Sequence, residues 1–216
     1  MLNEKLHFYI EGLISARIPL FTEMESYAKK HNVPIMELAG IETMLQLLRI
    51  HQSKKILEVG TAIGYSALRM ANALPKAQIV TIERDKERLH IAKKFIGRSE
   101  NGEQITLIEG DALEVEDLVQ GQAPFDAIFI DAAKGQYKKF FEIYEKYLSH
   151  DGMIITDNVL FKGLVAEQEI ESRRTRNLVK KIDEFNHWLM NHPDYDTVIL
   201  PVGDGVAISK RRGERK

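Results

Sequence analysis

The chain has 216 residues, of which 44% are hydrophobic and 29% are charged, and it contains no cysteine. This length predicts one soluble domain with a full core, and the lack of cysteine excludes disulfides, thiolate zinc sites, iron–sulfur clusters and a cysteine nucleophile. The formal net charge of −2 argues against bulk electrostatic capture of nucleic acid, so we expect no DNA partner.

The sequence shows no targeting or membrane-spanning segment. Its amino terminus has charges inside the apolar pattern and no small-residue cleavage site, and no later stretch is long and apolar enough to span a bilayer. We therefore expect no membrane partner, and the lack of cysteine fits the reducing cytoplasm best.

The first 50 residues are predicted to be helical. Apolar positions recur there at helical spacing, and Pro19 and Pro34 mark breaks between helices. From residue 54 the pattern changes to short apolar runs separated by amphipathic helices, and the five runs are KILEVG, QIVTIE, ITLIEG, DAIFID and GMIITD. Apolar strands that alternate with helices are typical of a parallel sheet covered on both faces.

The carboxyl-terminal part predicts one more helix and a hairpin. A long amphipathic helix covers about 174–191, and the runs DTVILPV and GVAISK flank Gly203-Asp204-Gly205 as an antiparallel hairpin. The predicted organisation is one α/β domain, with a helical segment over 1–50 and the sheet-containing core over 51–216.

The predicted strands share a polar end. Each run closes on an acidic residue or a glycine, and these residues are Glu58, Gly60, Glu83, Glu109, Asp111, Asp131 and Asp157. In open parallel sheets, ligands bind outside the carboxyl ends of the strands. The pattern therefore predicts a single ligand-binding edge.

Gly60 and Gly64 lie between the first predicted strand and the next helix, where glycines let a ligand approach the backbone. The spacing is neither G-x-G-x-x-G nor a phosphate loop, which disfavours a pyrophosphate ligand. Glu83, about 20 residues further on, is placed to bind ribose hydroxyls. A sugar without pyrophosphate suggests S-adenosylmethionine, with Asp111 and Ala112 near its adenine. The structural alternatives are a tight turn and a solvated strand end.

Two acidic strand ends suggest a metal site. Asp131, Asp157 and Asn158 offer two carboxylates and an amide oxygen, a hard ligand set that suits Mg²⁺ or another divalent cation. Lys134 is a candidate base, because a nearby cation and partial burial both lower the pKa of an amine. The alternative is that Asp131 caps the following helix and that Asp157-Asn158 forms a turn.

Several stretches resemble a known family. The segments ILEVGTAIGYSALRMA, TIERD, GDAL, FDAIFIDAAKGQY and GMIITDNVLFKG are similar to the class I metal-dependent O-methyltransferases related to catechol and caffeoyl-CoA O-methyltransferases. The resemblance covers essentially the whole chain. Within that family, DNVLFKGLVA, KIDEFNHWLMNHPDY and PVGDGVAISK most resemble the bacterial enzymes that methylate 5-hydroxyuridine at the tRNA wobble position.

The resemblance implies a Rossmann-like, mostly parallel seven-stranded sheet, an antiparallel carboxyl-terminal hairpin, amino-terminal helices over the cofactor, and a homodimer built partly on those helices. It implies metal ligation by Asp131, Asp157 and Asn158, with Lys134 as the base. It also implies contacts to S-adenosylmethionine, which involve Met36, Glu58, Gly60, Ser66, Glu83, Asp111, Ala112 and Asp131.

The implied substrate is tRNA, and the implied product is 5-methoxyuridine. Two basic segments are candidates for phosphate contacts, since cations position nucleic acid through its backbone. They lie within 173–181 and 210–216 and include Arg173, Arg174, Arg176, Lys180, Lys181, Arg211 and Arg212. Charge runs are also common on solvated helix faces. The alternatives are a catechol-type O-methyltransferase that acts on small molecules, a non-catalytic RNA-binding protein on the same fold and, remotely, a nicotinamide dehydrogenase.

Overall fold

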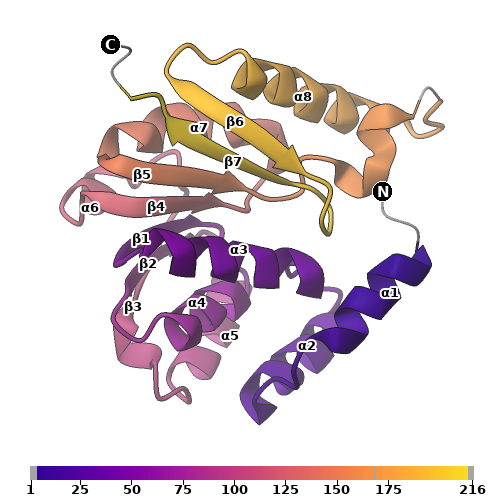
Figure 1. Cartoon of the computed structure of the whole chain (residues 1–216). Helices are drawn as coiled ribbons and strands as arrows, with labels where there is room; N and C mark the ends of the chain where they lie inside the picture. The colour runs from indigo at the N-terminus through magenta and orange to yellow at the C-terminus, as the bar shows by residue number, and fades with distance from the viewer. Residues whose placement is uncertain (1–3, 168, 214–216) are drawn as a thin grey trace.

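The structure is a computed structural model that describes residues 4–167 and 169–213. Its centre is a seven-stranded sheet in the order β3-β2-β1-β4-β5-β7-β6 (Figure 1). The strands are β1 Lys55–Val59, β2 Gln78–Glu83, β3 Ile105–Glu109, β4 Phe125–Ile130, β5 Leu148–Thr156, β6 Tyr195–Leu200 and β7 Val206–Arg211. Strands β1 to β5 pair in parallel, and β7 pairs antiparallel with both β5 and β6. The predicted sheet and its hairpin are confirmed.

Helices cover both faces of this sheet. The α-helices are α1 Glu4–Leu13, α2 Pro19–His31, α3 Leu38–His51, α4 Tyr65–Ala73, α5 Lys86–Ile96, α6 Glu116–Gln120, α7 Tyr137–Tyr144 and α8 Arg173–Met190. Four short 3-10 helices are also present, η1 Gly102–Gln104, η2 Lys134–Gln136, η3 Glu145–Tyr147 and η4 Phe161–Ala166. Side chains of α2 to α5 pack on one face, and those of α6, α7 and α8 pack on the other.

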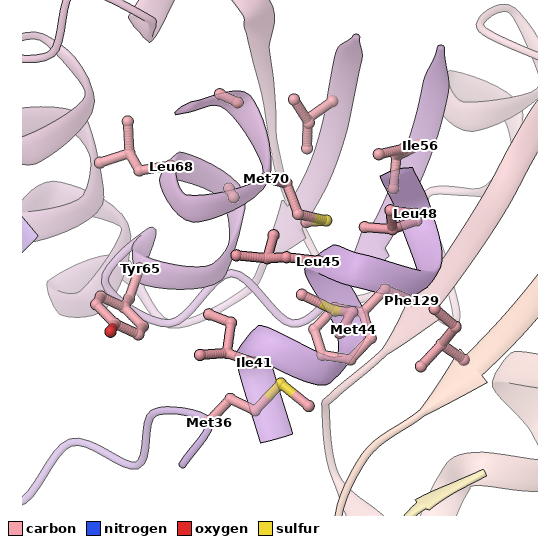
Figure 2. Close-up of a cluster of buried hydrophobic side chains, with 14 of the residues drawn as sticks. Met36, Ile41, Met44, Leu45, Leu48, Ile56, Tyr65, Leu68, Met70 and Phe129 are labelled. Carbon is pink, nitrogen blue, oxygen red and sulfur yellow. The ribbon is translucent and has the colours of Figure 1, made fainter. Parts of the chain in front are cut away.

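The two cores follow from the alternation of side chains along a strand. Ile56 of β1 and Phe129 of β4 join the cluster beneath α3 and α4, which Figure 2 shows in close-up. Their neighbours Leu57 and Ile128 join the cluster beneath α7 and α8. Because both faces of the central strands are buried, consecutive residues there are apolar, such as Ile128, Phe129 and Ile130 of β4, as the sequence predicted.

Local signals set the ends of several helices. Pro19 occupies the first turn of α2, where a missing N–H costs nothing. The Asp85 carboxylate accepts the Glu87 and Arg88 backbone N–H groups and so caps α5. The Ser172 hydroxyl accepts the Thr175 backbone N–H and caps α8. Helix α8 therefore begins at Arg173, one residue before the predicted start.

Helix α1 leaves a large apolar surface uncovered. Three of its residues are mostly exposed, namely Phe8 at 69%, Tyr9 at 64% and Leu13 at 67%. The predicted homodimer on the amino-terminal helices stays a prediction, as does the division of the chain at residue 50. Within the described residues, no helix is both long and apolar enough to cross a membrane.

Candidate active site

Asp131 and Asp157 come directly after the neighbouring strands β4 and β5. The Asp131 N–H donates to the Val59 carbonyl at 2.9 Å, and the Asp157 N–H donates to the Ile130 carbonyl at 3.1 Å. The sheet ladder therefore continues one residue beyond each strand. Since parallel strands lie about 4.8 Å apart, this pairing holds the two aspartates side by side at the edge of the sheet.

Asn158 completes a set of three oxygen-bearing side chains with these aspartates, which we call the oxygen group. Its φ of 59° lies in the left-handed region, so the chain turns sharply as it leaves β5. Its Nδ2 donates to Asp157 Oδ2 at 3.1 Å. The alternative of a turn at this pair is not confirmed, because no backbone hydrogen bond in the parts of the chain that the structure describes closes a turn there, and the assigned bend follows at residues 159–160. Asp131 does not cap a helix, since the next one, η2, has Ala133 at its N-cap and no side-chain cap bond.

The electrostatics of the oxygen group favour a bound cation. Burial raises the pKa of Asp131, and burial together with the Asp131 charge raises the pKa of Asp157 well above its usual value. Asp157 is only 2% exposed. A divalent cation would compensate two neighbouring carboxylates, and Mg²⁺ prefers such oxygen ligands. No three His, Cys, Asp or Glu residues in the described part of the chain form a metal cluster, so this set depends on the Asn158 amide.

Lys134 lies beside the oxygen group. Its Nζ donates a hydrogen bond to Asn158 Oδ1 and lies 5.8 Å from the centre of the Phe161 ring. Its positive charge opposes the rise in the pKa of Asp131 and of Asp157 without cancelling it. The amine is therefore within reach of any ligand that the oxygen group holds, and a cation ligated by Asn158 Oδ1 would compete with the present hydrogen bond.

A cavity, here called the strand-end cavity, opens beside the oxygen group. It joins seven of the predicted site residues, namely Gly60, Glu83, Asp111, Ala112, Asp131, Lys134 and Asn158. Gly60 has a φ of 106°, and a Cβ atom there would lie 2.1 Å from the Asp131 carbonyl oxygen. Only glycine permits this close approach of β1 to β4. Sequence reasoning missed other residues of the wall, including Pro34, Ala62, Arg84, Arg88 and Phe140.

Glu83 is fixed by backbone donors in the wall of the strand-end cavity. One carboxylate oxygen accepts the Ala62 N–H at 2.7 Å, and the other accepts the N–H groups of Arg84 and Asp85 at 2.9 and 2.8 Å. A carboxylate oxygen has more than one acceptor site, so Glu83 can still accept from a ligand hydroxyl. Asp111 is also fixed, since it accepts the Leu113 N–H and pairs with Arg84.

Three predicted cofactor contacts do not line the strand-end cavity. Met36 is 5% exposed and belongs to the core beneath α3 (Figure 2). Glu58 is completely buried and accepts hydrogen bonds from the Ser66 and Thr81 hydroxyls. Burial raises the pKa of Glu58 to about 7. The contacts of Met36, Glu58 and Ser66 with a cofactor stay predictions.

A second cavity, here called the hairpin cavity, lies between α1, the start of α3, η4 and the β6–β7 turn. Its wall includes Phe8, Glu37, Lys162 and Asp204. Burial and the Asp204 charge raise the pKa of Glu37. These residues are far apart in the sequence and meet only in the folded chain.

Comparison with known proteins identifies the family. Residues 14–212 match the family model described as O-methyltransferase. The chain belongs to this O-methyltransferase family. Catechol O-methyltransferase of Niastella koreensis is 37% identical over 217 residues, which cover 95% of this chain and 96% of that protein.

Solved structures of similar proteins share the fold of this O-methyltransferase. A protein from Staphylococcus aureus, whose crystal structure is described as that of a putative caffeoyl-CoA O-methyltransferase, is 38% identical in sequence. Its TM-score is 0.89, and the match covers 98% of this chain and 100% of that chain. The methyltransferase PaMTH1 of Podospora anserina, solved with SAH bound, is 26% identical with a TM-score of 0.85 over 97% and 95% of the two chains. The predicted Rossmann-like methyltransferase fold is thereby confirmed.

The predicted basic residues of the O-methyltransferase fall into two separate groups. The first group lies on α8, which starts near the end of the sheet that carries the oxygen group (Figure 1). Arg211 and Arg212 lie at the opposite end of the sheet, because β7 runs antiparallel to β5. Arg211 donates to the Glu145 carbonyl, and Arg212 pairs with Asp196 at 2.8 Å. The tail residues 214–216 lie outside the described residues.

Proposed function

We propose that this O-methyltransferase transfers the methyl group of S-adenosylmethionine to the 5-hydroxyl of 5-hydroxyuridine in tRNA, giving 5-methoxyuridine, with the help of Mg²⁺ or another divalent cation. The 5-hydroxyuracil ring carries O5 and O4 on adjacent carbons, as a catechol carries its two oxygens. A paired set of oxygens matches a site in which Asp131, Asp157 and Asn158 converge.

The strand-end cavity is the proposed site of the methyl donor. S-adenosylmethionine supplies an electrophilic methyl group, and the related PaMTH1 was solved with SAH. Gly60 keeps the backbone open to a ligand, and Glu83 presents its fixed carboxylate to a ribose. The cavity borders Asp131 and Asn158, so a donor there would lie next to the acceptor oxygen.

Asp131, Asp157 and Asn158 are the proposed metal ligands. A bound divalent cation would supply positive charge that lowers the pKa of the acceptor hydroxyl. Lys134 is the proposed base, and its amine would take the proton from that hydroxyl. Because Lys134 already contacts Asn158, it needs little movement to do so.

The observation that favours tRNA as the substrate is a run of exposed cations beside this site. Lys181 of α8 lies against η2, since its Cδ is 3.5 Å from the point that a Cβ on Gly135 would occupy. Arg173 and Arg174 are exposed at the start of the same helix. Phosphate groups of an RNA bound at the mouth of the site would meet these charges. We place this reaction in the cytoplasm and expect a homodimer.

A catechol-type reaction on a small molecule is the second candidate, because the relative from Niastella koreensis is a catechol O-methyltransferase. The deciding assay gives purified enzyme a labelled methyl donor and compares tRNA that bears 5-hydroxyuridine with caffeate-type catechols. Preferential labelling of the tRNA supports the proposal, and labelling of catechols alone overturns it. Nucleoside mass spectrometry of tRNA from a strain without this gene gives a second readout, the loss of 5-methoxyuridine.

A further inference from the structure

The tip of the β6–β7 hairpin is fixed to the segment that follows the oxygen group. The Asp204 carbonyl accepts the N–H groups of Leu160 and Phe161 at 2.9 and 3.1 Å, and the Gly205 carbonyl accepts the Val159 N–H at 3.1 Å. A Cβ on Gly205 would lie 2.4 Å from Leu160 Cγ, so the contact is close. Asp204 is therefore held in a defined position relative to Asn158.

Asp204 lines the hairpin cavity, and its backbone lies against the segment that leaves the oxygen group. Its negative charge also contributes to the raised pKa of Asp131 and of Asp157. No hydrogen bond or ion pair joins the Asp204 carboxylate to another residue in the described parts of the chain. A carboxylate in this position retains its full capacity to accept hydrogen bonds from a ligand.

The strand-end cavity borders the oxygen group itself, and the hairpin cavity borders the segment that follows it. The strand-end cavity includes Asp131 and Asn158 themselves, whereas the hairpin cavity includes Asp204 and Lys162, which lies four residues after Asn158. An acceptor ring held at the oxygen group must turn the oxygen that receives the methyl group toward the strand-end cavity. The rest of the ring then points away from the strand-end cavity, and the hairpin cavity lies next to the segment that follows Asn158.

The order of atoms in 5-hydroxyuracil decides what reaches Asp204. If O5 faces the donor, the O4 carbonyl comes next, and the imide N3–H follows O4 around the ring. We infer that Asp204 accepts a hydrogen bond from this imide N–H and thereby selects a 5-hydroxyuracil ring over a catechol. This inference rests on the proposed function, because it concerns the same acceptor site.

The chemical difference between the two acceptors is one polar group. A catechol presents a C–H bond where the uracil presents N3–H, so it would cover the half-buried carboxylate without donating a hydrogen bond to it. Sites built to bind an N–H or O–H group reject analogues that lack it, and one acceptor left without its donor corresponds to roughly 10²-fold discrimination. Asp204 is therefore assigned a role in specificity rather than in the chemical step.

The test measures kcat/KM on two acceptors, an anticodon-stem RNA with 5-hydroxyuridine and a free catechol. The enzymes are the wild type, Asp204→Ala, Asp204→Asn and the control Asp196→Asn, which changes a 77% exposed carboxylate at the other end of the hairpin. Asp204→Ala is expected to lower the RNA-to-catechol ratio of kcat/KM by roughly 10²-fold. Asp204→Asn is expected to lower it less, because an amide oxygen still accepts a hydrogen bond. Asp196→Asn is expected to leave the ratio unchanged. A third acceptor, RNA with N3-methylated 5-hydroxyuridine, should be insensitive to Asp204→Ala or improved by it.

The outcomes separate this inference from the proposed function. A loss on both acceptors by the same factor would show that Asp204 acts on folding or on the metal, and it would overturn the inference. Unchanged ratios in an enzyme that methylates the RNA would also overturn it, while the proposed function would stand. If the wild type methylates only the catechol, the proposed function fails, and the inference fails with it.

Discussion

The strand-end cavity and the hairpin cavity are built from different kinds of structure. The first has walls that come mainly from the ends of parallel strands, including Gly60, Glu83 and Asp131. The second joins four segments distant in sequence, including α1 and the β6–β7 turn. Strand ends of a parallel sheet meet at one edge by necessity, whereas the second arrangement depends on how helices and turns pack. The comparison suggests that reaction chemistry resides in the first cavity and acceptor choice in the second.

Removal of one proposed metal ligand is the strongest way to break this comparison. Asp157→Ala is expected to lower kcat by on the order of 10³-fold for every acceptor, because the remaining carboxylate and amide hold a divalent cation poorly. Binding of the methyl donor, measured by calorimetry, should persist, since Asp157 does not line the strand-end cavity. Full activity of the wild type after chelation of all divalent metal would contradict the proposed metal role.

Gly60→Ala tests the close approach of β1 and β4 that forms the strand-end cavity. A Cβ would meet the Asp131 carbonyl oxygen at 2.1 Å, and the φ of 106° is itself unfavourable for alanine. The free energy of unfolding is expected to fall by roughly 4 kcal/mol, as for severe overpacking combined with backbone strain. Gly121→Ala is the matched control, because the nearest atom to its added Cβ is 3.9 Å away. Equal melting temperatures for the two variants would disprove the strain argument.

The strand-end cavity could largely be predicted from the sequence. Short apolar runs that end in Glu83, Asp131 and Asp157 identify both the sheet and its ligand edge, because strand period and parallel pairing determine where these residues go. Membership of the O-methyltransferase family then agrees with the resemblance of these motifs. Local sequence carries this information because each residue is placed by the strand it follows.

The rest of the site depends on tertiary packing, which no local pattern encodes. Pro34 was predicted only as a break between helices, and it lines the strand-end cavity because the α2–α3 segment folds across the sheet edge. Asp204 was predicted as part of the turn of a hairpin, which is correct, but its place beside the segment that leaves β5 depends on the Leu160 and Phe161 N–H groups that donate to its carbonyl. Arg211 and Arg174 look alike in the sequence, and only the antiparallel pairing of β7 separates them.

The next prediction concerns the pH dependence of stability and the buried carboxylate of Glu58 in β1. Burial raises its pKa to about 7, so between pH 4.5 and 7 the folded chain keeps a proton that the unfolded chain has lost. The free energy of unfolding therefore falls as pH rises through this window, by about 3 kcal/mol in total. Glu58→Gln should remove that fall, so its stability relative to the wild type improves from pH 4 to pH 8. Denaturant unfolding in the absence of metal measures the effect, with the exposed Glu103→Gln as the control.

The smallest predicted effect concerns the surface beside the two cavities. Of the basic residues on α8, Arg176 donates to the Ile170 carbonyl and Lys180 pairs with Glu184, whereas Arg173 and Arg174 form no ion pair within the described residues. Arg173→Gln with Arg174→Gln is therefore expected to lower kcat/KM on tRNA by about tenfold and to reduce the salt dependence of binding by about one unit per lost phosphate contact.

Turnover of a small acceptor separates RNA binding from chemistry in this double variant. A free catechol or nucleoside has no phosphate backbone, so its kcat/KM should be unchanged when the two α8 arginines are neutralised. Arg212→Gln is the matched control, because this arginine lies at the opposite end of the sheet and pairs with Asp196. If Arg212→Gln weakened tRNA turnover as much as the α8 variant, RNA would have to reach the far end of the sheet. The mouth formed by η2 and α8 would then not be the main phosphate surface.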